Sequence, residues 1–351
     1  MAPASDLKYY PAFDYLRIFL ALTVAVGHAG IQPWEQSGNF AVQVFFAMSG
    51  WLIGAILLNS SRQDLPRFYF NRAARIWVPY FLTIILLIVA SLMKEPVTRK
   101  WIEIFFYDLT FTYNFFGPPQ LAESVAQMPL AGTGNHLWSI CAEEQFYLVA
   151  PLLLVLAGSA GRSLWLWALI AISIFASRYS LYFGAISLGV LAARSRLLWG
   201  DWQTGKTARA ILLALAAISF TLTIGNWLPY ETIAPLAAIF IVLAFAQCGQ
   251  ATPFGLWVGG ISYPLYLNHW IGIFLANALL TRAGLRETTI GSLTAVVFAV
   301  AVAALQYAMV DRRVMASRHR HFTTQRGIWI ASCGFILIAI GLVGAYFYGQ
   351  L

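Results

Sequence analysis

Charged residues are scarce in this chain of 351 residues: Asp, Glu, Lys and Arg make up 10% of it, whereas hydrophobic residues make up 60%. A soluble domain carries about a quarter charged residues, so this scarcity excludes an ordinary soluble globular protein. With a mean hydropathy of +0.71, the composition is typical of a polytopic membrane protein.

Cysteine is equally sparse, since only Cys141, Cys248 and Cys333 occur and no two form a CxxC pair. We therefore expect no disulfide framework and no metal site. The start, MAPASDLKYY, lacks the basic segment, short apolar core and small-residue cleavage site of a signal peptide, so the first apolar run is expected to be a retained helix. Matching halves, which many transporters show, are also missing.

What the chain does contain is a series of apolar runs long enough to cross, or nearly cross, a bilayer. They lie at roughly 13–30, 40–58, 76–93, 145–158, 164–177, 179–193, 210–225, 233–248, 256–279, 290–310 and 327–348. We predict an all-α polytopic membrane protein, a bundle of about 10–11 transmembrane helices. With the N-terminus in the cytoplasm, the inner loops hold fifteen Lys and Arg residues and the outer loops six, which favours this orientation. The net charge of +8 then needs no nucleic-acid partner.

Two segments depart from a minimal bundle. Residues 94–144 are predicted to form an outer loop that is too long for a simple connection. Residues 311–351 are predicted to be a basic cytoplasmic loop followed by a final transmembrane helix, which leaves residues 1–310 as the main membrane domain.

The first apolar run, FDYLRIFLALTVAVGHAG, carries three ionisable residues: Asp14, Arg17 and His28. Eleven helical residues turn through almost three full turns, so Arg17 and His28 share a face about 16 Å apart along the axis. Asp14 lies three residues before Arg17 and is expected to pair with it. These residues could simply mark a helix end and a wet membrane interface, but intramembrane ionisable residues also indicate a functional site.

Five segments of the chain carry a resemblance to a known family. They are FDYLRIFLALTVAVGH with its D-x-x-R start and R-x10-H spacing, VQVFFAMSGWLIG, RFYFNRAARIWVPY, HLWSICAEEQFYLVAPLLL and ISYPLYLNHW. In this order they resemble the motifs of the membrane-bound acyltransferase 3 family, which O-acylates cell-surface sugars and some small molecules. Asn268 stands where that family more often has an aromatic residue, and Cys141 where it usually has an apolar residue or Ser. The chain resembles the stand-alone form, without a fused SGNH-hydrolase domain.

The resemblance implies an integral-membrane O-acyltransferase of the bacterial cytoplasmic (inner) membrane. Its donor would be acyl-CoA, by default acetyl-CoA from the cytoplasm, and no tightly bound cofactor is expected. Its acceptor would be a hydroxyl of an extracytoplasmic or lipid-linked sugar or exopolysaccharide. Membrane lipids and polysaccharide-synthesis machinery are the further expected partners. The alternatives are a transporter or flippase of a glycan or glycolipid, and a structural subunit of a synthase complex.

The resemblance also suggests the catalytic and donor-binding residues. His28 is a candidate general base because an imidazole titrates near neutral pH, with Arg17 holding the donor and Asp14 orienting Arg17. Arg72 and Arg75 are candidate ligands of the CoA phosphates. They could instead belong to the excess of basic residues that cytoplasmic loops carry, and contact lipid headgroups. Ser49 is included in the donor site. A covalent acyl-histidine or acyl-serine path stays open beside direct transfer.

A third group of residues is predicted to bind the acceptor, and it lies mostly at the end of the predicted outer loop. It consists of Glu143, Glu144, His136, Trp138, Tyr147 and His269. An aromatic surface there could stack on a sugar. The simpler explanations are that the two glutamates stabilise a helix N-terminus and that His269 is a satisfied interior histidine.

Overall fold

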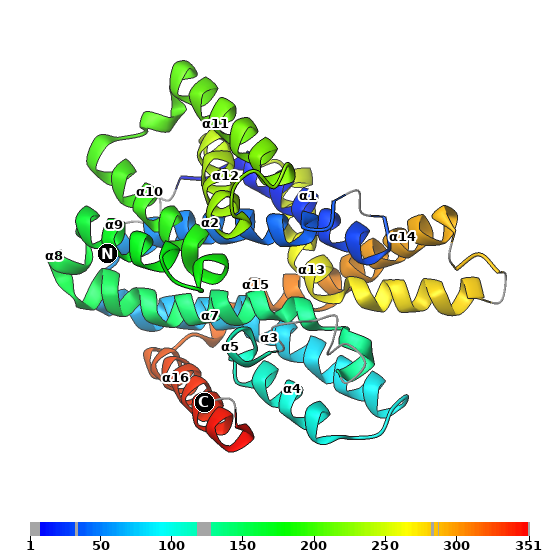
Figure 1. Cartoon of the computed structure of the whole chain (residues 1–351). Helices are drawn as coiled ribbons and strands as arrows, with labels where there is room; N and C mark the ends of the chain where they lie inside the picture. The colour runs from blue at the N-terminus through cyan, green and yellow to red at the C-terminus, as the bar shows by residue number, and fades with distance from the viewer. Residues whose placement is uncertain (1–7, 32–33, 118–127, 282–283, 287, 350–351) are drawn as a thin grey trace. The chain divides into compact units, whose positions relative to one another are not determined.

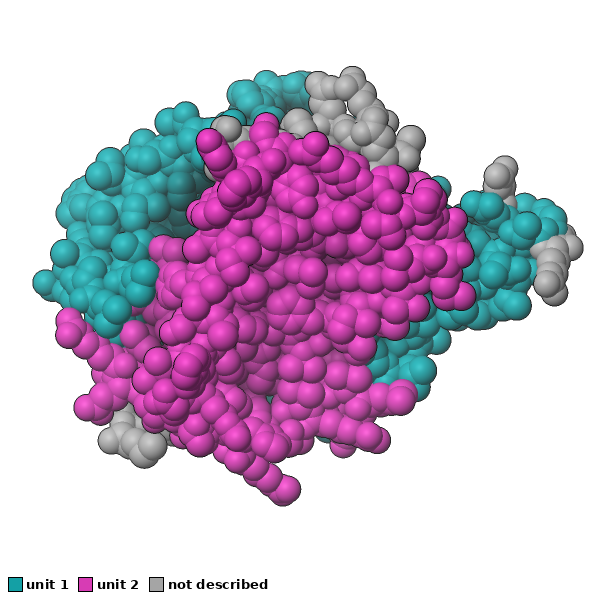
Figure 2. All heavy atoms as spheres, turned by 90° about the horizontal axis from the view of Figure 1, so that it is seen from below, with its two compact units in different colours: residues 1–60, 152–307 teal, residues 61–151, 308–351 magenta. Residues whose placement is uncertain are grey.

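The computed structural model describes residues 8–31, 34–117, 128–281, 284–286 and 288–349. Helices make up the ordered elements of these ranges and no strand occurs in them, which confirms the all-α prediction (Figure 1). The chain divides into two compact units, which Figure 2 colours separately: unit 1 is Met1–Ser60 with Leu152–Tyr307, and unit 2 is Ser61–Pro151 with Ala308–Leu351.

Unit 1 contains the first two helices and most of the second half of the chain. Its elements are α1 (Pro11–His28), α2 (Ser37–Leu58), η6 (Leu152–Leu156), α8 (Gly158–Gly161), α9 (Leu164–Phe175), η7 (Ser180–Gly184), α10 (Ala185–Trp199), η8 (Trp202–Thr204), α11 (Lys206–Ile224), α12 (Tyr230–Phe245), α13 (Pro253–Leu280) and α14 (Thr289–Gln306). The main packed pairs are α13 with α14, α10 with α2, α1 with α13, and α11 with α12. Helix α1 also packs on α2.

The α2–α10 pair approaches backbone to backbone. A Cβ placed on Gly50 would lie 2.1 Å from the carbonyl oxygen of Ile186, and one on Gly189 would lie 2.4 Å from that of Ala47. Only glycine allows such proximity, which is how membrane helices gain close van der Waals contact without a hydrophobic driving force between them. The Ser49–Gly50 segment therefore has a clear packing role.

Unit 2 contains the middle of the chain and its C-terminal part. Its elements are η2 (Arg62–Asp64), α3 (Leu65–Leu92), α4 (Arg99–Leu109), α5 (Tyr113–Phe116), η4 (Pro129–Gly132), η5 (Asn135–Leu137), α7 (Trp138–Pro151), α15 (Arg312–His321) and α16 (Thr324–Tyr348), with η10 (Tyr307–Asp311) preceding α15. Helix α3 is central, since α4, α7, α15 and α16 all pack on it. The segment 311–351, which the sequence analysis set apart, falls in the same compact unit as residues 61–151.

The helix starts follow local chemistry. Proline occupies the first turn of α1, α3 and α13, where its missing N–H is not needed and its fixed φ suits the helix. Threonine caps the starts of α4, α13, α14 and α16 by accepting a backbone N–H three residues on, as Thr98, Thr252, Thr288 and Thr323 do. These caps satisfy donors that would otherwise have no partner at a helix end.

Seven helical segments among the described residues are long and apolar enough, by length and composition, to cross a bilayer. They are Ser37–Leu58, Arg62–Leu92, Asn135–Leu156, Ser180–Trp199, Lys206–Ile224, Thr289–His321 and Thr324–Tyr348. Helices α9 and α12 are shorter and apolar, and α1 and α13 carry the polar motifs. Each predicted apolar run falls on one of these helices, which confirms the polytopic membrane fold, while the cytoplasmic N-terminus stays a prediction.

The predicted outer loop is more structured than expected. It contains α4 and α5, while residues 118–127 lie outside the described residues. Helix α7 already begins at Trp138, so Glu143 and Glu144 lie inside a helical segment that runs from Asn135 to Leu156. The helix-dipole effect acts within the first turn, and the helix N-terminus therefore does not explain these two glutamates.

An ion cluster fastens the start of the described chain to the α10–α11 connection. Asp201 accepts a bond from the ammonium of Lys8 and another, at 2.6 Å, from Nε of Arg196. Burial raises the pKa of Asp201, but the bonds from Lys8 and Arg196 lower it by more, so the net shift is downward. The carboxylate is thereby held in its charged form.

Candidate active site

The predicted ion pair on α1 is present in unit 1. Nη1 of Arg17 lies 3.0 Å from Oδ1 of Asp14, and Tyr9 donates its hydroxyl hydrogen to the other carboxylate oxygen, Oδ2. Burial and this hydrogen bond raise the pKa of Tyr9 to about 12, so Tyr9 is a neutral donor at physiological pH. A Cβ on Gly259 would come within 2.6 Å of Oδ1 of Asp14. Asp14 is thus held by α13 packing as well as by hydrogen bonds.

At the other end of α1, His28 meets a second histidine. Nδ1 of His28 lies 2.6 Å from Nε2 of His269 on α13, and the two rings stack with centroids 4.8 Å apart and planes 16° apart. His28 is exposed, whereas His269 is 2% exposed. An accessible imidazole therefore rests on a buried one, although 241 residues separate them in sequence.

The second bond of His269 fixes which nitrogens carry hydrogen. Nδ1 of His269 lies 2.9 Å from the backbone oxygen of Tyr266, and a carbonyl oxygen can only accept. In the neutral ring Nδ1 is then the donor and Nε2 the acceptor, so Nδ1 of His28 must donate to it. The tautomer of neutral His28 that follows keeps its lone pair on Nε2, as a general base requires.

Helix α13 is distorted at the residue that precedes His269. Asn268 has φ −123° and ψ 16°, and its Nδ2 donates to Oε1 of Gln306 on α14 at 2.6 Å. The ring of Tyr266 packs edge-on against Phe45 of α2 at 6.1 Å. The departure from the aromatic residue expected at position 268 therefore supplies a polar link to α14, and the kink lies beside the histidine pair.

In unit 2 the structure joins two of the recognised motifs. The guanidinium of Arg72 lies 5.8 Å from the ring centre of Tyr147 and 5.9 Å from that of Phe68, distances typical of cation–π contacts. The hydroxyl of Tyr147 donates to Oε1 of Glu143, one turn earlier on α7. Arg72, predicted for the donor, and Glu143 with Tyr147, predicted for the acceptor, thus form one connected group.

Glu144 faces α3 at a neighbouring position. Nε1 of Trp77 donates to Oε1 of Glu144 at 2.8 Å, and Glu144 is 3% exposed. Its other oxygen, Oε2, is buried without a hydrogen-bond partner among the described residues. Such an oxygen is expensive to desolvate, so Glu144 is a candidate for a ligand contact or for protonation in the membrane interior.

Comparison with known proteins bears directly on these motifs. The profile of the acyltransferase domain, acyltransferase 3, matches residues 10–308. The chain belongs to the acyltransferase 3 family. The match to this family includes α1, the histidine pair, and the Arg72 and Glu143 group, and it ends before α15.

Named relatives of this acyltransferase 3 chain are O-acetyltransferases. It is 31% identical over 158 residues to the peptidoglycan O-acetyltransferase OatA of Listeria monocytogenes. The aligned region covers 42% of this chain and 24% of OatA. It is 25% identical over 328 residues to a putative O-acetyltransferase of Staphylococcus aureus strain COL, covering 78% of this chain and 52% of that protein. The chain thus spans about half the length of these relatives, or less. No solved structure matches it.

The remaining predicted site residues of this acyltransferase 3 domain are distributed over both units. Ser49 is half-buried on α2 of unit 1. In unit 2, His136 is buried in η5, Trp138 begins α7 half-buried, and Arg75 is exposed on α3. Their predicted roles stay predictions.

Two residues that contact predicted site residues escaped the sequence analysis, Tyr9 and Trp77. So did Gln306, which contacts Asn268 beside His269. Trp77 lies in the RIWVPY part of the recognised motif RFYFNRAARIWVPY, so the motif was the signal that could have identified it. Tyr9 and Gln306 lie in no motif, and only the folded chain brings them to Asp14 and Asn268.

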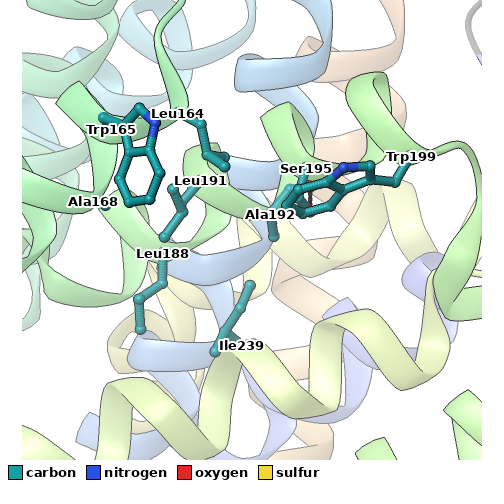
Figure 3. Close-up of a pocket in the computed structure, with 9 residues that line it drawn as sticks. All are labelled: Leu164, Trp165, Ala168, Leu188, Leu191, Ala192, Ser195, Trp199 and Ile239. Atoms are coloured by element: carbon teal, nitrogen blue, oxygen red, sulfur yellow. Dashed lines mark hydrogen bonds between the residues drawn. The ribbon is translucent and has the colours of Figure 1, made fainter.

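One hollow in unit 1 is lined by none of these residues. It measures about 320 Å³, and Figure 3 shows residues of α9, α10 and α12 around it, among them Trp165, Leu188 and Ile239. Ser195, the polar residue in its lining, already donates to the carbonyl of Ala192 and accepts from Trp202. Such an apolar wall suits lipid and offers no group for acyl transfer.

Proposed function

We propose that this chain is an integral-membrane O-acetyltransferase that moves an acetyl group from acetyl-CoA to a sugar hydroxyl. The observation that carries the proposal is the contact between His28 and His269 in a member of the acyltransferase 3 family. It supplies an accessible imidazole whose neutral tautomer carries its lone pair on Nε2, backed by a buried residue that fixes that tautomer.

The proposed reaction is a direct transfer. Nε2 of His28 takes the proton of the acceptor hydroxyl while the hydroxyl oxygen attacks the thioester carbonyl. The new C–O ester bond forms, the C–S bond breaks, and the CoA thiolate leaves and receives the proton from His28. His269 stabilises the charged imidazolium only through its acceptor nitrogen, so one bond both orients His28 and disperses its charge.

Arginine residues take the proposed role of binding the donor. Arg72 and Arg75 lie three residues apart on α3, and forked guanidinium groups match the phosphate oxygens of CoA. Tyr147, held by Glu143, would keep Arg72 in position. In unit 1, Arg17 paired with Asp14 would hold the donor at a point about 16 Å along α1 from His28.

The proposed acceptor is a sugar hydroxyl of a cell-envelope polysaccharide or its lipid-linked precursor. The support is the name of OatA from Listeria monocytogenes, a peptidoglycan O-acetyltransferase. The proposed location is the bacterial cytoplasmic membrane with the N-terminus inside, which the distribution of basic residues in the loops supports.

Radiolabelled acetyl-CoA and protein purified in lipid nanodiscs would test the proposal. We expect release of CoA and labelling of a polysaccharide acceptor by the native chain, with complete loss in His28→Ala. His319→Ala is the matched control, since His319 is exposed on α15. Turnover that survives in His28→Ala would refute the general-base role. If the label stays on the protein after quenching in the absence of acceptor, the reaction passes through a covalent acyl-enzyme and is not a direct transfer.

A further inference from the structure

Helices α15 and α16 both pack on α3, and the contacts around their junction run antiparallel to it. Gly327, in the first turn of α16, meets α3 at Pro66, where a Cβ on Gly327 would be 2.1 Å from the Pro66 carbonyl oxygen. Phe322 packs against Phe70 at 5.5 Å and lies under the guanidinium of Arg67 at 4.5 Å. From Gly327 back to Phe322, directly after the end of α15, the contacts on α3 advance from Pro66 to Phe70.

The next step of this register brings arginines together. Arg318 lies one helical turn before Phe322, and its charge interacts with that of Arg75, which lies just over one turn beyond Phe70. Arg72 interacts electrostatically with both Arg75 and Arg318. Three guanidinium groups, two from α3 and one from α15, are thus within electrostatic range of one another where α15 packs on α3.

Nothing in the described part of the chain neutralises this cluster by an ion pair. None of the three arginines takes part in the ion pairs found there. Nε of Arg72 and Nε of Arg318 are buried without a hydrogen-bond partner among the described residues, and the bond that Arg318 does make is a weak one to the sulfur of Met315 at 3.6 Å. Glu143 and Glu144 are the carboxylates that act electrostatically on Arg72; Tyr147 engages the first and Trp77 the second.

Guanidinium groups stay protonated in proteins, so the cluster cannot relieve its repulsion by losing a proton. Like charges held together destabilise a fold unless an anion lies between them. The unused Nε–H groups supply directed donors, and the forked geometry of Arg suits two oxygens of one phosphate. The arrangement is therefore complementary to a phosphate ester or a pyrophosphate.

We propose that Arg318 completes a phosphate-binding site with Arg72 and Arg75. Helix α15, which lies beyond the part of the chain matched by the acyltransferase 3 family, then belongs to the binding machinery. The ligand chemistry is a phosphate ester or pyrophosphate, carried either by CoA or by a lipid headgroup. The CoA source rests on the proposed function, whereas the site itself does not.

The test measures binding to the full chain in phosphatidylcholine nanodiscs, which offer no net anionic lipid. The probes are CoA, inorganic pyrophosphate and pantetheine, the last of which lacks phosphate. We expect Arg318→Ala to weaken CoA and pyrophosphate binding about tenfold or more, as loss of a charged hydrogen bond predicts, and to leave pantetheine binding unchanged. Arg320→Ala is the matched control, since Arg320 is exposed on the same helix and its loss removes the same charge.

A second arm separates the two sources of phosphate. Nanodiscs that contain phosphatidic acid are analysed by native mass spectrometry for lipid retained by each variant. If Arg318→Ala loses phosphatidic acid but keeps native CoA affinity, the site is upheld and its ligand is the lipid. If the native chain binds no CoA but binds pyrophosphate through Arg318, the donor assignment in the proposed function fails and the site stands.

Two results would overturn the proposal. One is equal affinity of the native chain and Arg318→Ala for CoA, pyrophosphate and phosphatidic acid. The other is an equal loss in Arg318→Ala and Arg320→Ala, which would reduce the effect to general surface charge. Should Arg318→Ala not fold, Arg318→Lys keeps the stem and charge but removes the fork, and unchanged affinity in that variant would also count against the site.

Discussion

Replacing His269 tests whether its acceptor nitrogen sets the reactivity of His28. In His269→Leu the side chain keeps an apolar volume but offers no acceptor to Nδ1 of His28, which lies 2.6 Å from Nε2 in the native chain. The tautomer of His28 that carries its lone pair on Nε2 then loses the bond that selects it. In His269→Gln, Oε1 can take the place of Nε2 as acceptor.

The magnitude follows from that one hydrogen bond. A bond to a group that becomes charged contributes about 1.5–3 kcal/mol, and each 1.36 kcal/mol of barrier is a factor of about ten in rate. We therefore expect kcat to fall about 10- to 150-fold in His269→Leu and to recover in large part in His269→Gln. Because His269 is buried and touches no substrate in this reading, KM for acetyl-CoA should stay within about twofold.

The assay is steady-state release of CoA from acetyl-CoA in nanodiscs, recorded across pH for the native chain and both variants. The positioning role also predicts a displaced pH–rate profile in His269→Leu, which a purely structural loss would not give. Native kcat with an unchanged pH profile in His269→Leu would refute the tautomer argument. Equal losses in the Leu and Gln variants, with lowered melting temperatures in both, would reassign His269 to packing.

Three further perturbations address other parts of the structure. Gly259→Ala places a Cβ within 2.6 Å of Oδ1 of Asp14, so we expect a loss of about 1–3 kcal/mol of stability and reduced turnover; a native melting curve would contradict the close packing. Tyr147→Phe keeps the ring over Arg72 but loses the bond to Glu143, so KM for acetyl-CoA should rise about threefold to tenfold at constant kcat, and an unchanged KM would remove Tyr147 from donor binding. The pKa of Asp201 is lowered in the folded chain, so its stabilising contribution is complete above the unfolded pKa near 4 and is lost as the pH falls through the lowered value. Asp201→Asn should therefore cost less than about 1 kcal/mol at pH 7 and progressively less as the pH falls below about 4, and a pH-independent difference in melting temperature would contradict the ion cluster.

The sequence was sufficient for most of the fold and for one half of the candidate site. Apolar runs mark helices because the bilayer demands length and hydrophobicity, and helical spacing alone indicates that Asp14 and Arg17 can pair. Local patterns of this kind act over a few turns. They are therefore readable without knowledge of the folded chain.

The rest depends on contacts between distant segments. The sequence marks His28 and His269 separately, each in its own motif, and their contact exists only because α1 packs on α13. The start of α7 was placed too late because the run WSICAEEQ is polar, and its polar groups are tolerated in a helix by partners on α3 such as Trp77. Arg318 was assigned to a loop because its segment is also polar. The residues of α3 on which that segment packs are far away in sequence.

The packing of α1 on α13 has a mechanical consequence. Asp14 rests against Gly259 near one end of α1, and His28 rests on His269 at the other, so two points of contact hold the same pair of helices in parallel. Within α1, the helical rise separates Arg17 from His28 by about 16 Å. Because α1 keeps this separation fixed, only a substrate that extends over about 16 Å can contact Arg17 and His28 at once.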